Sequence, residues 1–207
     1  NNGPGVEILK INAFPFAPPT GHAILGNSIY GNGGIGIDYD VDSSPAPDFM
    51  ADDFIGVTVN DIGDVDSGPN NFQNYPVAYD MQVSGPGSVA ISFYLDSLMA
   101  QDYRIEFFRN ATPDASGHGG GEEFLTAETI THTGSGVEAF TANVTGATAL
   151  VEGDNIAMTA TVINLANPTG FSETSEFSSN SIVGSLAVDF GDAPDGRVLV
   201  NAQTGER

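Results

Sequence analysis

Short apolar groups separated by Asn and Gly fill residues 24–38 and constrain the fold more than any other feature. The segment reads Ile-Leu-Gly-Asn-Ser-Ile-Tyr-Gly-Asn-Gly-Gly-Ile-Gly-Ile-Asp. Gly and Asn tolerate the positive φ angles of tight corners, whereas β-branched and aromatic residues favour strands. The pattern predicts short strands joined by turns, with candidates at residues 6–11, 22–25, 35–39 and 54–59.

A second pattern begins near residue 77, where apolar and polar residues alternate over longer segments. The alternating apolar sets are Val89, Ile91, Phe93 and Leu95; Tyr103, Ile105 and Phe107; Phe140, Ala142 and Val144; and Ile156, Met158, Ala160 and Val162. Side chains of a strand alternate between its faces, so each set is predicted to point inward, with Thr141 and Thr159 on the opposite face. No helical period of comparable length appears. About seven strands of a sandwich are expected between residues 77 and 183.

The segment Asn60-Asp-Ile-Gly-Asp-Val-Asp-Ser-Gly-Pro-Asn-Asn resembles the end of the right-handed parallel β-helix in large secreted bacterial surface proteins. In that family such a segment leads into an immunoglobulin-like β-sandwich. Ile105-Glu-Phe-Phe, Ala157-Met-Thr-Ala-Thr-Val and Thr174-Ser-Glu-Phe-Ser look like elements of that sandwich, although Asn110 and Asn180 stand near places where the family usually has cysteines. The resemblance covers roughly residues 24–183.

The resemblance implies an all-β fold, an immunoglobulin-like Greek-key β-sandwich preceded by a partial parallel β-helix or β-rich cap. The expected division is residues 1–76 for the β-helix-like segment, 77–184 for the sandwich and 185–207 for a linker or assembly tail. One or two coils of a solenoid fit into the first part. Solenoid coils bury their faces against neighbours, so this part is expected to lean on something else.

The chain is strongly acidic, with 27 Asp and Glu against 5 Lys and Arg and a net charge of -22. Nucleic acid is therefore excluded as a partner, because phosphate neutralisation needs basic side chains. No apolar run approaches the ~18 residues of a membrane span, so membrane insertion is not expected. Self-repulsion of this size favours cation binding, and calcium is the expected cofactor.

Two acidic stretches supply the candidate calcium ligands, because calcium takes six to eight oxygens from carboxylates, amides and carbonyls. The candidate ligands are Asp38, Asp40, Asp42, Asn60, Asp61, Asp64, Asp66 and Asn70. The complete EF-hand pattern is absent. The alternative is a set of solvated turns in which Asp and Asn side chains bond to their own backbone.

Catalysis is not expected. The chain has no Cys, and His22, His118 and His132 have no Ser in a nucleophile context near them in sequence. Glu122 and Glu123 form an acidic pair of the kind that glycosidases use, but one or two coils give no substrate groove.

Asn110-Ala-Thr and Asn143-Val-Thr match the N-glycosylation pattern, which also occurs by chance in a chain rich in Asn and Thr. Asn143 alternates with inward residues and is expected to face solvent.

Residues Val6, Ile8, Leu9 and Ile11 form an apolar run that is expected to add to the sheet of another copy of the chain. A head-to-tail contact of this kind gives an open filament. The alternatives are that the run packs on its own sandwich or pairs with further coils of a longer chain.

The function predicted from these observations is a non-catalytic structural or adhesive module of an extracellular, cell-surface protein or filament, stabilised by calcium. The alternative is a carbohydrate-binding or polysaccharide-processing module with surface polysaccharide as its partner. Such modules usually expose an aromatic platform, yet Trp is absent and Tyr30, Tyr39, Tyr75 and Tyr79 are scattered.

Overall fold

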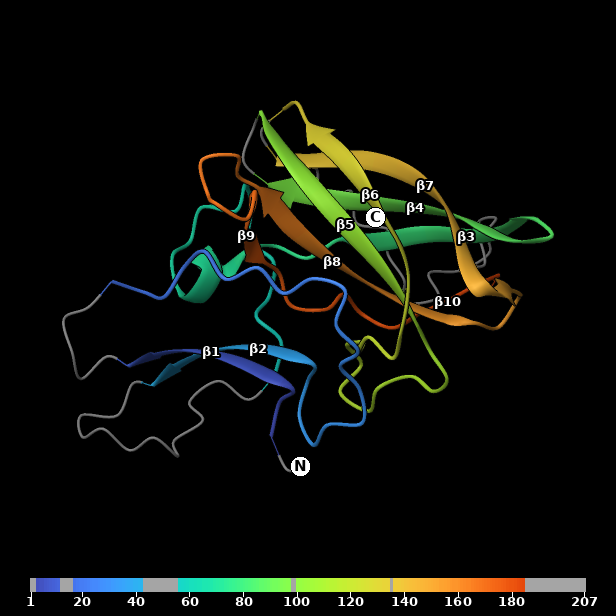
Figure 1. The fold of residues 1–207 in the computed structure, drawn as a ribbon, viewed down its shortest axis with the longest axis horizontal. Helices are drawn as coiled ribbons and strands as arrows, with labels where there is room; N and C mark the ends of the chain where they lie inside the picture. The colour runs from blue at the N-terminus through green and yellow to red at the C-terminus, as the bar shows by residue number, and fades with distance from the viewer. Residues whose placement is uncertain (1–2, 12–16, 43–55, 98–99, 135, 185–207) are drawn as a thin grey trace, which may run out of the picture.

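The computed structural model describes residues 3–11, 17–42, 56–97, 100–134 and 136–184. Within these residues the protein consists of ten β-strands and one short 3-10 helix, η1 (Pro69–Phe72) (Figure 1). The predicted all-β fold is confirmed. The proposed tail, residues 185–207, lies outside the described residues.

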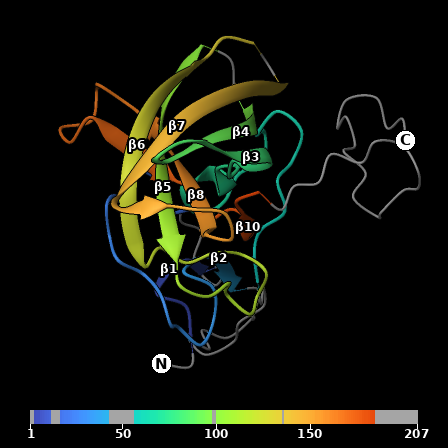
Figure 2. The same ribbon diagram turned by 90° about the vertical axis from the view of Figure 1, so that its right-hand side faces the viewer.

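Two antiparallel sheets form the sandwich (Figures 1 and 2). One sheet has the order β3 (Val77–Gly85), β4 (Gly87–Ser97), β7 (Gly136–Leu150). The other has the order β10 (Ser181–Ile182), β8 (Asn155–Ile163), β5 (Gln101–Asn110), β6 (Glu123–His132), with β9 (Phe171–Thr174) paired to β8. The chain crosses between the sheets after β4, β6 and β7, which is the Greek-key arrangement of immunoglobulin-like sandwiches. The described part of this region contains eight strands, close to the number expected, and two of them, β9 and β10, are short.

The core between the sheets follows the predicted alternation. Val89, Ile91, Phe93 and Leu95 of β4 are all fully buried. Phe93 lies at the centre of an aromatic group, and its ring centroid is 6.0 Å from that of Phe107 on β5. The inward faces assigned from the sequence are therefore correct for these strands.

The second sheet is also buried on its outer face, which the alternation did not predict. Phe108, Ala157 and Thr159 lie on the face of β5 and β8 that points away from the sandwich core, and each is at most 2% exposed. Thr159 lies on the opposite face, as predicted, and it is buried because another layer of the chain covers this face. Thr141 on β7 is exposed as expected.

That additional layer is the N-terminal segment, which contains β1 (Val6–Ile11) and β2 (Ile37–Asp42) (Figure 1). The two strands pair in parallel, with Val6 opposite Ile37 and Ile11 opposite Asp42. A second apolar cluster joins this segment to the sandwich; it consists of Ile8, Ile29, Ile37, Tyr39, Phe108, Ala157 and Phe177. The N-terminal segment thus packs on its own sandwich.

Two predicted strands are not formed in the part of the chain that the structure describes. Residues 22–25 are irregular because side chains bind their backbone: the N–H of His22 donates to Asn70 Oδ1, and the N–H of Ile24 donates to Thr174 Oγ1. Residues 56–59 are also irregular, and residues 54–55 lie outside the described part. The described residues contain one parallel strand pair, which is a β-rich cap; a β-helix needs several coils.

Candidate functional site

The loop from residue 61 to residue 66 contains the one group of three potential metal-ligating side chains in the described part of the chain. The loop winds tightly, since Gly63 and Asp64 have φ angles of 77° and 53°. One carboxylate oxygen from each of Asp61, Asp64 and Asp66 therefore lies within 4.8 Å of the others. Calcium prefers oxygen ligands of this kind, so the acidic loop is the candidate cation site.

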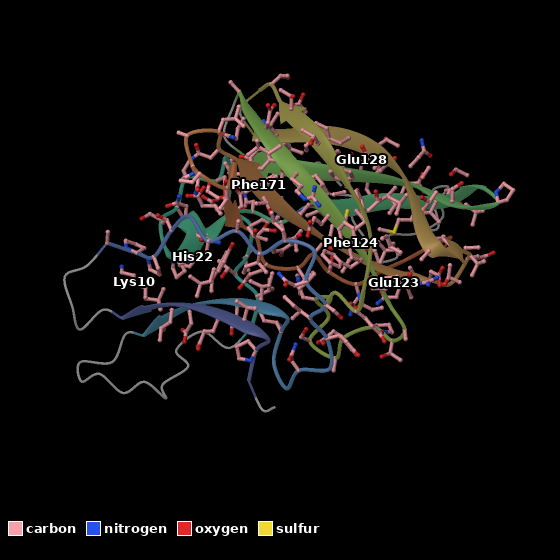
Figure 3. The ribbon with its side chains drawn as sticks, in the orientation of Figure 1. Lys10, His22, Glu123, Phe124, Glu128 and Phe171 are labelled. Carbon is pink, nitrogen blue, oxygen red and sulfur yellow. The ribbon has the colours of Figure 1, made fainter. Side chains whose placement is uncertain are left out.

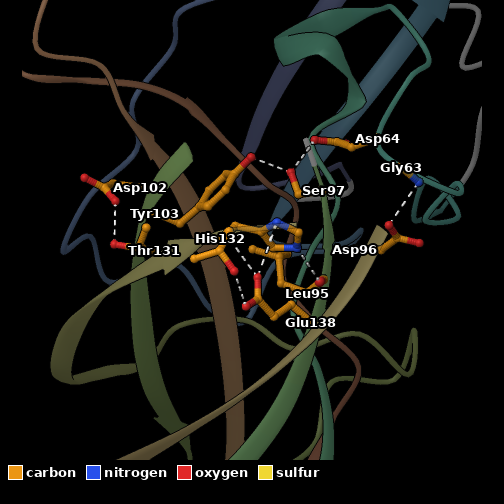
Figure 4. Close-up of polar contacts among 11 residues, drawn as sticks. Gly63, Asp64, Leu95, Asp96, Ser97, Asp102, Tyr103, Thr131, His132 and Glu138 are labelled. Carbon is orange, nitrogen blue, oxygen red and sulfur yellow. Dashed lines mark hydrogen bonds and ion pairs between the residues drawn. The ribbon is translucent and has the colours of Figure 1, made fainter. Parts of the chain in front are cut away.

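Asp64 anchors the acidic loop to the end of β4 (Figure 4). Its Oδ1 accepts a hydrogen bond from the backbone N–H of Asn74 at 2.9 Å, and its Oδ2 accepts one from the Ser97 hydroxyl at 3.0 Å. The Ser97 hydroxyl is also hydrogen-bonded to the hydroxyl of Tyr103 on β5. The position of the Asp64 carboxylate is thus set by both sheets of the sandwich.

Asn74 and Asp96 hold the remainder of the loop. The side-chain amide of Asn74 donates to the backbone oxygens of Asp61 and Asp96, at 2.8 and 2.9 Å. The N–H of Gly63 donates to Asp96 Oδ1 at 3.0 Å. The loop is therefore preorganised by the sandwich.

The electrostatics of the acidic loop favour a bound cation. Burial raises the pKa of Asp64 to about 6, and the nearby charges of Asp61 and Asp66 act in the same direction. Burial and the charge of Asp61 raise the pKa of Asp66 to about 6. Adjacent carboxylates disfavour one another's charged form, and a divalent cation relieves that repulsion.

Asn60 and Asn70 have a structural role that differs from the ligand role predicted for them. Asn60 exchanges two hydrogen bonds with the backbone of Tyr75, at 2.8 and 3.0 Å. Asn70 is fully buried; its amide donates to the backbone oxygens of His22 and Thr174, and its oxygen accepts from the N–H of His22. Both side chains use their amides to hold irregular backbone.

Asp38, Asp40 and Asp42 lie on β2, and the carboxylates of Asp38 and Asp40 are not part of the acidic-loop group. Alternate residues of a strand point to the same face. Asp38 and Asp40 therefore share a face of β2, but no third described ligand is grouped with them. Asp40 is 2% exposed, and the side chain of Asp42 lies outside the described residues.

The two glycosylation candidates differ in accessibility. Asn110 is 6% exposed, and the nitrogen that a glycan would modify, Nδ2, donates to the backbone oxygen of Gly120 at 2.8 Å. Its Oδ1 accepts from the N–H of Glu122. Asn110 is therefore unsuitable for a glycan in the folded chain, whereas Asn143 is exposed on β7 as predicted.

The three histidines occupy separate places. His132 is fully buried, with Nε2 3.2 Å from the backbone oxygen of Leu95 and Nδ1 3.6 Å from the Glu138 carboxylate (Figure 4). The His118 ring contacts the backbone oxygen of Phe177. His22 lies in the irregular segment near β1 (Figure 3). The ring contacts of His118 and His132 give these two side chains structural roles.

The two edges of the parallel sheet are different. The N–H of Val6 donates to the oxygen of Gly36 at 2.9 Å, so alternate residues of β1, including Val6 and Ile8, direct their backbone groups toward β2. The backbone groups of Leu9 point away from β2. A groove of about 580 Å³ lies between β1 and residues 21–24. No described strand pairs with the outer edge of β1.

The outer edge of β2, in contrast, is closed by a buried side chain. Glu176 is 1% exposed, and its two oxygens accept hydrogen bonds from the N–H groups of Tyr39, at 2.8 Å, and Thr58, at 2.6 Å. The Glu176 side chain thus takes the place that another strand would occupy.

The residues predicted to mediate assembly differ in their exposure to solvent. Ile8 is buried against the sandwich and does not offer its side chain to a partner. Val6 and Leu9 are partly exposed beside the groove, while the side chain of Ile11 lies outside the described residues. A partner strand could therefore bind β1 mainly through its outward backbone groups, and less through its apolar side chains.

Two buried carboxylates, Glu106 and Glu176, were missed at the level of sequence. Glu106 is fully buried; its Oε1 pairs with Arg104, and its Oε2 accepts from the N–H of Gly26 in the N-terminal segment. The sequence Ile-Glu-Phe-Phe at residues 105–108 carried a usable signal, because apolar residues on both faces of a strand indicate that both faces are covered. The Glu between them needs a buried partner.

No model of a known protein family matches the chain, and no curated protein matches it. In the described residues, no helix is long and apolar enough to cross a lipid bilayer.

Proposed function

We propose that the protein is a non-catalytic structural module of an extracellular surface protein or filament, which assembles with copies of itself by strand addition at β1. The supporting observation is the asymmetry of the two-stranded sheet. Glu176 closes the edge of β2, whereas no described strand pairs with the outer edge of β1, and β1 lines a groove.

Strand addition is a common use of such an edge. Outward N–H and C=O groups form a template for another chain, and native proteins usually cover or blunt them. The interior side of the sheet is already fixed on the sandwich through Ile8, Ile37 and Tyr39, so the edge is held in an extended shape before a partner arrives. A preorganised edge loses little conformational entropy on binding.

Calcium has a supporting role in this proposal. The native acidic loop is preorganised, and an ion that binds only the folded chain stabilises it by about 2.7 kcal/mol at ~100 times its dissociation constant. We expect a higher melting temperature in calcium than in chelator at matched ionic strength. Asp66→Asn, at an exposed ligand, is expected to reduce the difference, and Asp102→Asn, at an exposed site on β5, is not. Equal melting temperatures would remove calcium from the account.

The assembly proposal is tested with Leu9→Pro. Because the N–H of Leu9 points away from β2, proline at this position removes an outward donor without removing a bond of the β1–β2 ladder, and proline is tolerated on edge strands. Leu9→Ala, which keeps the N–H, is the matched control. Light scattering over a range of concentrations should show growing mass for the wild type and Leu9→Ala, and the mass of a single chain for Leu9→Pro.

The outcomes separate the possible arrangements. Mass that keeps growing with concentration supports a head-to-tail filament, whereas a plateau at two chains indicates a closed dimer. A wild-type protein that is monomeric at every concentration, or a Leu9→Pro variant that assembles like the wild type, would refute strand addition at β1.

A further inference from the structure

A cleft of about 650 Å³ lies at the end of the sandwich where β8 ends and the chain turns toward β9. Val65 of the acidic loop and Leu165 of the turn after β8 line this cleft and are 73% and 88% exposed. Val59 and Ile62, before and within the acidic loop, are 79% and 80% exposed. These are the four most exposed large apolar side chains of the described residues, and such a concentration marks a candidate contact surface.

Hydrogen bonds fix the backbone that presents the two apolar side chains of the cleft. The N–H of Val65 donates to Asp61 Oδ2 at 3.2 Å. In the turn after β8, the side-chain oxygen of Asn164 accepts from the N–H of Ala166 at 3.1 Å and so spans the backbone of Leu165. The exposure of Val65 and Leu165 is therefore built into the walls of the cleft.

The cleft is also negatively charged. Asp64, Asp66 and Glu173 line it, and no Lys or Arg occurs among its described lining residues. Glu173 is the inserted residue of a bulge in β9, a feature that redirects a side chain. Its carboxylate accepts from the Asn71 amide and the Ser172 hydroxyl, and the partners of the other two carboxylates are likewise neutral N–H and O–H groups. Among the described residues none of the three forms an ion pair, so their charge is not balanced locally.

The other polar side chains of the lining are bonded within the chain. The Gln101 amide donates to the oxygen of Ile163 at 2.9 Å, and the Gln73 amide donates to the next backbone oxygen. The Tyr103 hydroxyl is bonded to Ser97, and its ring is 1% exposed, so it offers no stacking surface (Figure 4). What the cleft presents to a ligand is therefore mainly negative charge beside apolar surface.

We propose that this cleft binds a segment of a partner protein in which an Arg or Lys is flanked by large apolar residues. The cation pairs with the carboxylates, and Arg does so with strong, charge-assisted hydrogen bonds. Its apolar neighbours remove Val65 and Leu165 from water. A metal ion would meet only the first of these demands and an apolar ligand only the second. Anionic ligands are opposed by the lining and by the net charge of -22.

A second copy of the chain matches the cleft less well. Arg104 and Arg109 are already ion-paired with Glu106 and Glu123, which leaves Lys10 of β1 as the remaining basic residue of the described part. The acidic charge of a second copy also opposes its approach to this end of the sandwich. The inference goes beyond the proposed assembly, since the cleft shares no residue with β1 and binds its partner whether or not copies assemble.

The test is calorimetric titration of the intact chain, in chelator, with three acetylated and amidated peptides. Leu-Arg-Leu carries both features, Leu-Gln-Leu lacks the charge, and Gly-Arg-Gly lacks the apolar side chains. We expect Leu-Arg-Leu to bind with a millimolar or lower dissociation constant and the other two to bind at least about tenfold more weakly.

Two variants locate the binding. Leu165→Ser removes an apolar wall and Asp66→Asn removes a charge, and each should weaken binding of Leu-Arg-Leu about fivefold. The matched controls are Val151→Ser, at an exposed residue beyond the other end of β8, and Glu128→Gln, at an exposed residue of β6. Both controls should bind like the wild type. All four replaced side chains are exposed, and circular dichroism checks that each variant is folded.

Four results would overturn the proposal. They are no binding of Leu-Arg-Leu, equal binding of either of the other peptides, binding that neither Leu165→Ser nor Asp66→Asn weakens, and binding that the control variants weaken as much. Light scattering tests the other occupant: self-assembly that is lost in Leu165→Ser and kept in Val151→Ser would assign the cleft to a second copy instead.

Discussion

Glu176 is the best place to test how the N-terminal segment is attached to the sandwich. Burial, with a smaller effect from the charge of Asp38, raises the pKa of Glu176 from 4.5 to about 8, although the N–H groups of Tyr39 and Thr58 favour the charged form. The folded chain therefore holds a proton at neutral pH that the unfolded chain releases. Because this carboxyl accepts a hydrogen bond from Tyr39 of β2, the protonation of Glu176 is linked to the packing of β2 on the sandwich.

The direction of the pH effect follows from this difference. Between pH 4.5 and 8 the folded state binds more protons than the unfolded state at Glu176, so the free energy of unfolding falls as pH rises through this window and levels off above it. At pH 6 the folded carboxyl is almost fully protonated, and at pH 8 it is about half protonated. The resulting loss between pH 6 and pH 8 is about 2 kcal/mol.

Glu176→Gln removes this titration. Its single side-chain oxygen accepts only one of the two backbone N–H groups, and the unpaired group costs about 1–3 kcal/mol. We therefore expect Glu176→Gln to be less stable than the wild type at pH 6. The difference should shrink by about 2 kcal/mol at pH 8, because only the wild type loses stability through this carboxyl.

Urea unfolding at pH 6, 7 and 8, in chelator, measures these free energies. Glu128→Gln removes the same charge from an exposed position on β6, away from β1 and β2 (Figure 3), and should follow the wild type at each pH. If Glu176→Gln loses as much stability between pH 6 and pH 8 as the wild type does, the buried-proton explanation is refuted.

Further predictions concern packing and modification. Met158→Ala should lower the free energy of unfolding by about 2–5 kcal/mol and the exposed Thr141→Ala by much less, measured by urea unfolding; equal losses would contradict the strand faces. Gly36→Ala should destabilise the chain because its Cβ would lie 2.8 Å from the Phe177 ring, and an unchanged melting temperature would show that the ring has room to move. In a glycosylating host, mass spectrometry should find any N-glycan at Asn143; a glycan on Asn110 of folded protein would contradict its burial.

Sequence reasoning was most successful where a local pattern has one structural meaning. Strict alternation in β4 assigned its buried face correctly, because successive side chains of a strand must point to opposite sides. It was least successful where side chains from distant segments form the hydrogen bonds of the backbone. Residues 22–25 resemble a strand in composition, but the Asn70 side chain binds His22 from a site 48 residues away. No local pattern contains that contact.

The same division applies to the candidate cation site. The sequence identified Asp61, Asp64 and Asp66, whose turn chemistry is local, but it weighed Asp38 and Asp40 equally. Only the structure showed that the wound loop groups three carboxylates, whereas Asp38 and Asp40 lie on a strand with no third described ligand beside them.

By itself, the sequence determined the all-β class and the alternating faces of the long strands, since these follow from the side-chain period. The tertiary structure decided that the N-terminal segment packs against the outer side of β5 and β8, that buried Glu106 bonds to Gly26 of this segment, and that buried Glu176 bonds to Tyr39 of β2. The physical reason is that burial and desolvation depend on the neighbours of a residue in space, and residues such as Gly26 and Glu106 meet only after the chain has folded.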